Sequence, residues 1–193
     1  MGCCLIRKNL FSKFFLCCGQ GQTGKSSYLR LIKNLVGKHN ASFLSINDLE
    51  EKFGPIDLHN KLVNLGDDVP YYLKETATLK KLVTGEEFLA DQKYKQPINF
   101  ENFATLIFTT NKLPEVSDKS TGFYRRLMII ELNNKITKPD MFFFDRLTDA
   151  DYEYLLSKAI SAVTKAIKNG KLTSYDGAEE KLEKYRREQS ATL

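Results

Sequence analysis

The sequence of 193 residues lacks the long apolar runs of membrane proteins. No continuous apolar stretch reaches the roughly 18 residues that a transmembrane helix needs. The segment before Gln20 and Lys25 also lacks the small-residue cleavage site of a secretory signal. We therefore expect a cytoplasmic protein that is neither secreted nor bound to a membrane.

Side chains that bind metals are also scarce. The only histidines are His39 and His59, and the four cysteines form two adjacent pairs, Cys3-Cys4 and Cys17-Cys18. Zinc sites usually space their cysteines by two or more residues. The pattern argues against a structural zinc site and favours reduced or buried thiols, as in cytosolic proteins.

The sequence has no internal repeat and no low-complexity stretch. Apolar residues make up 42% of it and charged residues 27%, which is typical of one globular domain with a real core. The net charge of +5 favours an anionic partner such as a nucleic acid, although many unrelated proteins are equally basic.

Short apolar segments alternate with helical patterns along most of the chain. This alternation predicts an α/β fold with a mainly parallel sheet. The last fifty or so residues are mostly helical in pattern, so we expect a core domain over 1–135 and a helical extension over 136–193. Strands are expected at 14–18, 42–46, 61–65, 103–110 and 127–132, helices at 26–36, 77–83, 156–170 and 178–188, and a hairpin at 86–96.

The segment from Gly19 to Ser26 matches the phosphate-binding pattern G-x-x-x-x-G-K-[ST] in full. Glycines let backbone N–H groups curl around phosphates, and the following helix points its positive end at them. Lys25 would contact the β- and γ-phosphates of ATP, and Ser26 would bind Mg²⁺. A glycine-rich turn that matches by chance is the alternative, which the strand before and the helix after disfavour. The expected nucleotide-binding residues are Gly19, Gln20, Gly21, Gln22, Thr23, Gly24, Lys25, Ser26 and Ser27.

Polar residues also follow two other predicted strands. Asp67 and Asp68 come just after the strand at 61–65, so Asp67 is expected to hold Mg²⁺ and Asp68 to activate the attacking water. Asn111 ends the strand at 103–110 and, if that strand lies beside the phosphate-binding loop, can contact the γ-phosphate or the water. The alternatives are an ordinary Gly-Asp turn and a plain strand terminator.

Taken in order, these motifs resemble superfamily 3 helicases, in the branch found in phage and plasmid primase-helicases. The resemblance runs from Gly19–Ser26 through Gly66–Asp68, 79–95 and Phe108–Pro114 to Tyr124–Leu127, and so covers about residues 1–135. One residue departs from the pattern, because the family often has glutamate where Asp68 stands.

The resemblance implies an AAA+-like P-loop ATPase that forms a ring, usually a hexamer, on single-stranded or forked DNA. It would be a DNA helicase or translocase for phage or plasmid replication, in bacterial or viral-host cytoplasm, hydrolysing ATP between subunits. A primase or origin-binding region on a separate or missing segment is implied as a partner. The helical extension over 136–193 would stop before a winged-helix region.

The resemblance also gives roles to basic residues. Lys93 and Lys95 lie two apart on a predicted strand, so their side chains should face the same way. In the family this segment is a hairpin that projects into the channel, which suits contact with DNA phosphates, whereas edge-strand protection is the alternative. Arg126 directly precedes the strand at 127–132 and is expected to act as an arginine finger on a neighbouring subunit's ATP, while Arg125 serves an interface.

Two rival functions remain at this point. A small P-loop kinase of nucleosides or nucleotides has about this length, but the segment after Asn111 offers no arginine-rich lid. A non-catalytic, DNA-binding remnant of a helicase is the other, and the intact phosphate-binding motif argues against it.

Overall fold

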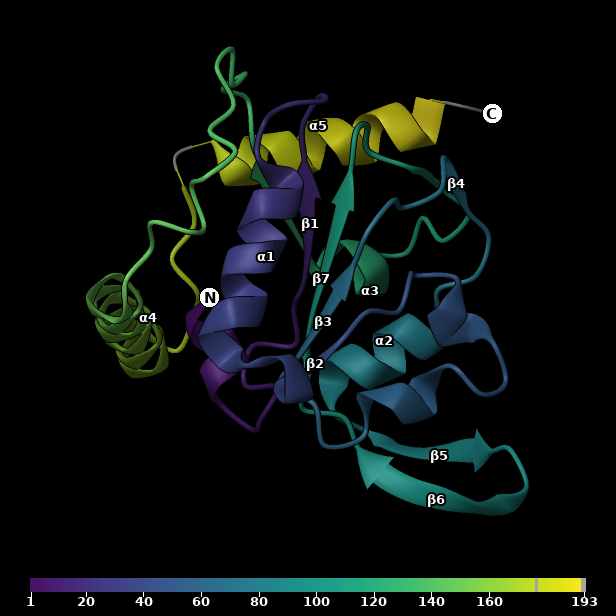
Figure 1. Cartoon of the computed structure of the whole chain (residues 1–193). Coiled ribbons are helices and arrows are strands. Elements are labelled where there is room, and N and C mark those ends of the chain that lie inside the picture. Colours follow the sequence, from purple (N-terminus) through teal and green to yellow (C-terminus); the bar gives the residue numbers. More distant parts are fainter. Residues whose placement is uncertain (176, 192–193) are drawn as a thin grey trace.

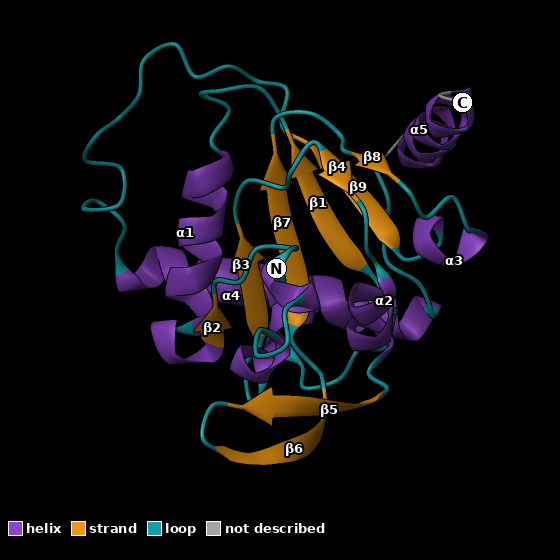
Figure 2. Cartoon of the chain, turned by 90° about the vertical axis from the view of Figure 1, so that its right-hand side faces the viewer, coloured by secondary structure: helices purple, strands orange, loops and turns teal. Residues whose placement is uncertain are grey.

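A computed structural model of the chain describes residues 1–175 and 177–191 and has a mixed α/β fold (Figure 1). At its centre is a five-stranded sheet in the order β2-β3-β7-β1-β9, and each adjacent pair is parallel (Figure 2). The predicted mainly parallel sheet is therefore confirmed. In chain order its strands are β1 (Phe14–Cys18), β2 (Ala41–Ser42), β3 (Val63–Gly66), β7 (Thr105–Thr110) and β9 (Leu127–Glu131).

Helices cover both faces of this sheet because the strands carry apolar side chains on both sides. On one face α1 (Lys25–Val36) buries Leu29, Ile32 and Val36 against the strands. On the other face lie α2 (Ala77–Thr84) and α3 (Thr121–Tyr124), with the larger apolar cluster between them and the sheet. Short 3-10 helices fill the connections: η1 (Gly2–Leu5), η2 (Lys38–Asn40), η3 (Asp48–Glu50) and η4 (Pro55–Leu58).

The predicted strand at 42–46 shrinks to the two residues of β2. The side chain of Asn64 on β3 accepts a hydrogen bond from the backbone N–H of Leu44 and donates one to its carbonyl, both at 2.9 Å. These bonds satisfy the groups that a longer strand would have paired with its neighbour. The chain therefore bends away after Ser42.

Two smaller sheets lie outside the main one. The hairpin of β5 (Glu87–Gln92) and β6 (Lys95–Glu101) projects at the lower end of the molecule in Figure 1, with Ala90 and Phe100 buried at its base. The pair of β4 (Tyr72–Leu73) and β8 (Glu115–Val116) is parallel and lies near the other end. The hairpin predicted at 86–96 is confirmed, but its second strand continues through Pro97 to Glu101.

The C-terminal helices belong to the same packing unit as the sheet. Helix α4 (Asp149–Asn169) starts with a capping box of Thr148 and Asp151 and packs on η1. Helix α5 (Ala178–Ala191) places Tyr185 in the large apolar cluster, where its hydroxyl donates to the carbonyl of Pro114 at 2.5 Å. The predicted division between 1–135 and 136–193 is therefore no break in the core.

None of the helices described has both the length and the apolar character that a membrane crossing requires.

Candidate functional site

The predicted nucleotide-binding residues meet at one edge of the main sheet. Strand β7 lies between β1 and β3, with Cys18 beside Thr110 and Gly66 beside Phe108. Because the strands are parallel, their carboxyl ends share an edge, at the upper end of the sheet in Figure 1. The segments that follow, which carry Gly19, Asp67 and Asn111, are therefore neighbours.

The loop from Gly19 to Gly24 requires glycine at both of its ends. A Cβ atom on Gly19 would lie 2.4 Å from the carbonyl oxygen of Leu132, and Gly24 has a φ of +84°. At Gly21 a Cβ atom would meet nothing within 4 Å. The N–H of Gly19 donates to the carbonyl of Thr110 at 3.1 Å, so the loop is attached to β7 at its start.

Lys25 connects this loop to Asn111. Its ammonium donates to the carbonyls of Gly19 (2.5 Å) and Gln20 (3.0 Å) and to Oδ1 of Asn111 (2.8 Å). Helix α1 begins at Lys25 without a side-chain cap. The backbone N–H groups of its first turn, next to the exposed Ser26 and Ser27, are therefore open to an anion.

Asp67 is oriented by a residue that the sequence reasoning missed. The hydroxyl of Thr109, which is fully buried on β7, donates to Oδ1 of Asp67, as does the N–H of Asp68 at 3.1 Å. Asp68 has a φ of +46°, a left-handed backbone that aspartate tolerates better than most residues. The sequence feature that could have indicated this role is the pair Thr109-Thr110 just before Asn111.

The acidic residues offer few metal ligands. Within the described part of the chain, no three His, Cys, Asp or Glu side chains lie together as a metal site. Mg²⁺ in nucleotide sites commonly takes one or two protein oxygens, with phosphate and water supplying the rest. The exposed Ser26 and Asp67 fit that arrangement, whereas a transition-metal centre does not fit.

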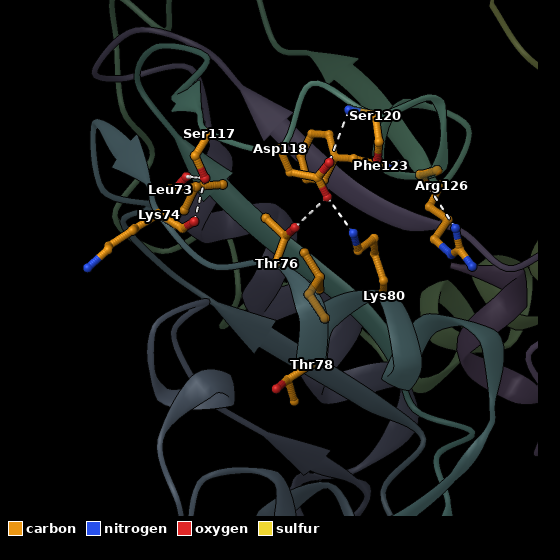
Figure 3. A network of polar contacts seen from close by, with 12 residues as sticks. Leu73, Lys74, Thr76, Thr78, Lys80, Ser117, Asp118, Ser120, Phe123 and Arg126 are labelled. Atoms are coloured by element: carbon orange, nitrogen blue, oxygen red, sulfur yellow. Dashed lines mark hydrogen bonds and ion pairs between the residues drawn. The ribbon is translucent and has the colours of Figure 1, made fainter.

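The two arginines before β9 differ sharply in exposure. Arg126 is only 9% exposed, and its Nη1 donates to the carbonyl of Gly122 at 2.7 Å (Figure 3). Burial and the neighbouring Arg125 lower the pKa of Arg126. Arg125 is exposed, and its carbonyl accepts from Lys13 at 2.6 Å. The sequence-based choice of Arg126 over Arg125 as the residue that reaches a neighbour disagrees with this burial.

The hairpin places its two lysines differently from the prediction. Lys93 and Tyr94 form the turn between β5 and β6, and only Lys95 lies on a strand. The prediction that both lysines lie on one strand is therefore wrong, because the chain turns at Lys93 and Tyr94, where Tyr94 has a φ of +60°. Its side chain is fully exposed, and the sequence reasoning did not single it out.

A polar network on the face of the sheet that carries α2 and α3 joins these two helices. The sequence analysis did not predict it. Asp118 accepts from Lys80 at 2.5 Å and from Thr76 at 2.7 Å with one oxygen, and from the N–H of Ser120 at 3.0 Å with the other (Figure 3). Ser120 in turn caps α3. Burial opposes the charge on Asp118, but these hydrogen bonds prevail and hold its pKa well below the usual range.

Comparison with known proteins identifies distantly similar proteins that are encoded by viruses. The chain is 25% identical over 146 residues to a DNA primase-polymerase of Nitratiruptor phage NrS-1, covering 73% of this chain and 19% of the relative. It is 25% identical over 148 residues to a protein named "Putative helicase" of Acanthamoeba polyphaga mimivirus, covering 70% and 15%. The chain thus spans less than a fifth of either relative's length.

Solved structures of similar fold include the C-terminal region of NrS-1. The apo C-terminal region of NrS-1 aligns with a TM-score of 0.60 and 21% identity, covering 92% of this chain and 42% of that one. A further apo structure of the region, residues 305–718, gives 0.61 and 19%, covering 92% and 43%. A family model for a family of unknown function, DUF5906, matches residues 17–126, from the end of β1 to the residue before β9. The chain therefore belongs to the DUF5906 family.

Proposed function

We propose that this chain is an AAA+-like P-loop ATPase that works on DNA as a helicase or translocase motor during replication of a phage, plasmid or virus. The observation that carries the proposal is the contact between Lys25 and Asn111, with Asp67 beside it on the next strand end. A phosphate-binding loop, an acid and a polar sensor on adjacent strand ends are the parts that phosphoryl transfer needs. The names of the distant relatives support a role in replication.

In the nucleotide-binding step, the loop from Gly19 to Gly24 and the first turn of α1 would bind the phosphates of ATP. Lys25 donates three hydrogen bonds at present, two of them to carbonyls of its own loop. Phosphate oxygens carry negative charge, so they attract the Lys25 ammonium more strongly than neutral carbonyl oxygens do. ATP would therefore draw Lys25 off Gly19 and Gln20 and onto the phosphates.

Mg²⁺ would supply positive charge to the phosphates, held by Ser26 and Asp67. Thr109 occupies one oxygen of Asp67 and leaves the other free to face the ion. Asp68 would orient or deprotonate the water. Asn111 already bonds Lys25, so its side chain is placed to respond when Lys25 moves to the γ-phosphate.

DNA would bind at the opposite end of the sheet, on the hairpin. Lys93 and Lys95 would contact phosphates, and Tyr94 offers an exposed aromatic face on which a base can stack.

Motor function further implies a ring of subunits, which we propose to be hexameric. Arg125, which is exposed just before β9, is then the better candidate for the arginine finger that reaches a neighbouring subunit's ATP. Arg126 would instead stabilise its own subunit through its hydrogen bond to Gly122.

Steady-state ATP hydrolysis with and without single-stranded DNA tests this proposal. We expect measurable hydrolysis that DNA stimulates and that Lys25→Ala abolishes. Turnover that ignores DNA but requires a nucleoside acceptor would instead indicate a small P-loop kinase. DNA binding without any hydrolysis, at protein concentrations high enough for assembly, would indicate a non-catalytic remnant.

A further inference from the structure

Two stretches of the chain contain basic residues and no acidic ones. Residues 1–47 have seven Lys and Arg and no Asp or Glu, and residues 154–175 have four Lys and again no acid. The whole chain, by contrast, has 29 Lys and Arg against 24 Asp and Glu. Positive charge is therefore concentrated in these two stretches, which favours an anionic partner there.

The fold brings the two stretches together. The N-terminus lies beside α4 (Figure 1), and η1 packs on this helix. The fit is close, because a Cβ atom on Gly2 would lie 2.5 Å from a carbonyl oxygen of α4. Past η1, Lys8 and Lys13 line a hollow of about 20 Å³ together with Leu172, which follows Lys171 in the chain. The lysines of both stretches thus share one surface.

A groove lies where the two stretches meet. It has a volume of about 500 Å³ and runs between β9, the end of α4 and the start of α5. Its lining includes three ammonium groups, one amide and two hydroxyls, all of which can donate hydrogen bonds. Among the described residues, Glu179 is the only acid that lines it. We call it the basic groove and define it by Lys13, Lys165, Asn169, Lys171, Thr173 and Ser174.

No carboxylate neutralises these lysines within residues 1–175 and 177–191, where the ion pairs involve other residues. Lys13 is half-buried, its ammonium donates to the carbonyl of Arg125 at 2.6 Å, and burial lowers its pKa. A partly desolvated ammonium gains more from an anion than one in open water does. The favourable charge of a helix C-terminus accounts for Lys168 in the last turn of α4, but not for Lys13, which is on no helix.

The N-terminal stretch also contacts the base of the hairpin. The side-chain amide of Asn9 donates to the carbonyl of Asn102, the residue after β6, at 2.7 Å. The guanidinium carbon of Arg7 lies 5.7 Å from the centre of the Phe103 ring. Lys8, between Arg7 and Asn9, is exposed. The basic surface therefore starts where the hairpin joins the sheet and leads to the basic groove.

We infer that the basic groove binds the sugar-phosphate backbone of a nucleic acid strand that continues past the hairpin. Lysine ammonium groups and the side chains of Ser, Thr and Asn are the groups that contact phosphates, without reading the bases. Because the cations extend from the hairpin to the groove, they suit a row of phosphates better than one small anion. The inference rests on the proposal that the chain works on DNA, but not on its ATPase activity.

The test is binding of a fluorescent 30-nucleotide single strand of thymidine, measured by anisotropy with the full chain over a range of salt concentrations. Lys165→Gln with Lys171→Gln should weaken binding about tenfold and reduce the logarithmic salt slope by about 0.7 for each lost contact. Both side chains are exposed, so the thermal melt should not change. Glu179→Gln should have the opposite effect and strengthen binding, because it removes the acid that faces the phosphates.

Lys138→Gln with Lys184→Gln is the matched control. Both lysines are exposed, neither lines the basic groove, and the net charge changes by the same amount. Lys184 comes two residues after Leu182, which lines the groove, so its side chain points to another side of α5. The control should keep the affinity and the salt slope of the wild type.

The same substitutions in a Lys93→Ala/Lys95→Ala background separate the groove from the hairpin. If the groove variant loses affinity there and the hairpin variant alone does not, the inference holds and the hairpin part of the proposed function fails. Equal affinities of the groove variant and its matched control would overturn the inference, as would a Glu179→Gln variant that binds no more tightly than the wild type. A polyglutamate peptide that binds more tightly than DNA and is lost in the groove variant would overturn it in favour of an acidic protein.

Discussion

The two ends of the central sheet are built in different ways. At the carboxyl end, the site is made of main-chain groups and buried contacts: Gly19 lies against Leu132, and Thr109 holds Asp67. At the other end, the hairpin offers exposed side chains around Tyr94 with few constraints. A nucleotide site requires fixed geometry, whereas a surface that follows a nucleic acid strand can adapt. Substitutions at the two ends of the sheet test this contrast.

Lys25→Ala should reduce ATP hydrolysis to background, because the variant loses the charge that faces the phosphates. Its fold should persist, since within the described residues the hydrogen bonds of Lys25 go to its own loop and to Asn111. The measurement is steady-state hydrolysis together with a thermal melt. Normal turnover by a folded variant would show that the loop is not a nucleotide site.

Arg125→Ala should also abolish hydrolysis if the proposed ring places this exposed residue at a neighbour's ATP. Mixing it with Lys25→Ala should recover part of the activity, because some interfaces then pair an intact loop with an intact arginine. Arg126→Ala mixed with Lys25→Ala should recover less, since Arg126 is buried and needed within its own subunit. Specific activity that stays flat with protein concentration, without recovery on mixing, would contradict the ring.

Gly19→Ala should destabilise the chain by about 1–3 kcal/mol, the usual cost of forcing an extra atom into packed surroundings. The added Cβ would lie 2.4 Å from the carbonyl of Leu132, so the loop must shift and nucleotide affinity should fall as well. Gly21→Ala is the matched control, because a Cβ there meets nothing within 4 Å. Urea unfolding of both variants makes the comparison, and equal stabilities would refute the tight fit at Gly19.

These expectations differ in how much of their basis could be read from the sequence. The glycine and lysine positions of the loop could be predicted, since backbone curvature around a phosphate allows few residue types. Burial of Arg126 could not, because it depends on a carbonyl at Gly122 and on packing that no local pattern records. The same holds for Thr109, whose partner Asp67 is 42 residues away in sequence.

The hairpin shows a second feature that the sequence predicts only in part. A run of charged and apolar residues predicts a hairpin, but the turn position depends on which residue adopts a positive φ. Here it is Tyr94, a residue type that rarely does so. Because Gln92 pairs with Lys95, Lys93 falls in the turn and Lys95 on β6.

At the hairpin, replacing Lys93 and Lys95 together by alanine should weaken single-stranded DNA binding while basal hydrolysis is retained. Each lost phosphate contact should reduce the logarithmic salt slope by about 0.7. Tyr94→Ala should cost about 1–3 kcal/mol of DNA affinity through lost stacking, with the salt slope unchanged. Fluorescence anisotropy over a range of salt concentrations separates the two effects, and an unchanged slope in the double variant would leave the lysines as edge protection.

The smallest effect concerns Asp118, whose lowered pKa couples stability to pH. A carboxyl group with a depressed native pKa stabilises the fold above its unfolded value of about 3.9 and loses that contribution as the pH falls toward the native value. Asp118→Asn should therefore cost about 1–2 kcal/mol at neutral pH and little in strong acid. Unfolding curves at pH 7 and pH 3 give the comparison, and a cost that does not shrink at the lower pH would contradict the charge-based account.

The position of Tyr185 has a consequence for local motion. More than half of the residues of α5 are charged, so the helix on its own would be marginal in water and would exchange its amide hydrogens quickly. Tyr185 and Leu182 instead pack with the core, and Gln189 accepts from the backbone of Val116 at 2.9 Å. Amides near Tyr185 should then exchange only when the core itself opens, on the same timescale as those of β1 and β7.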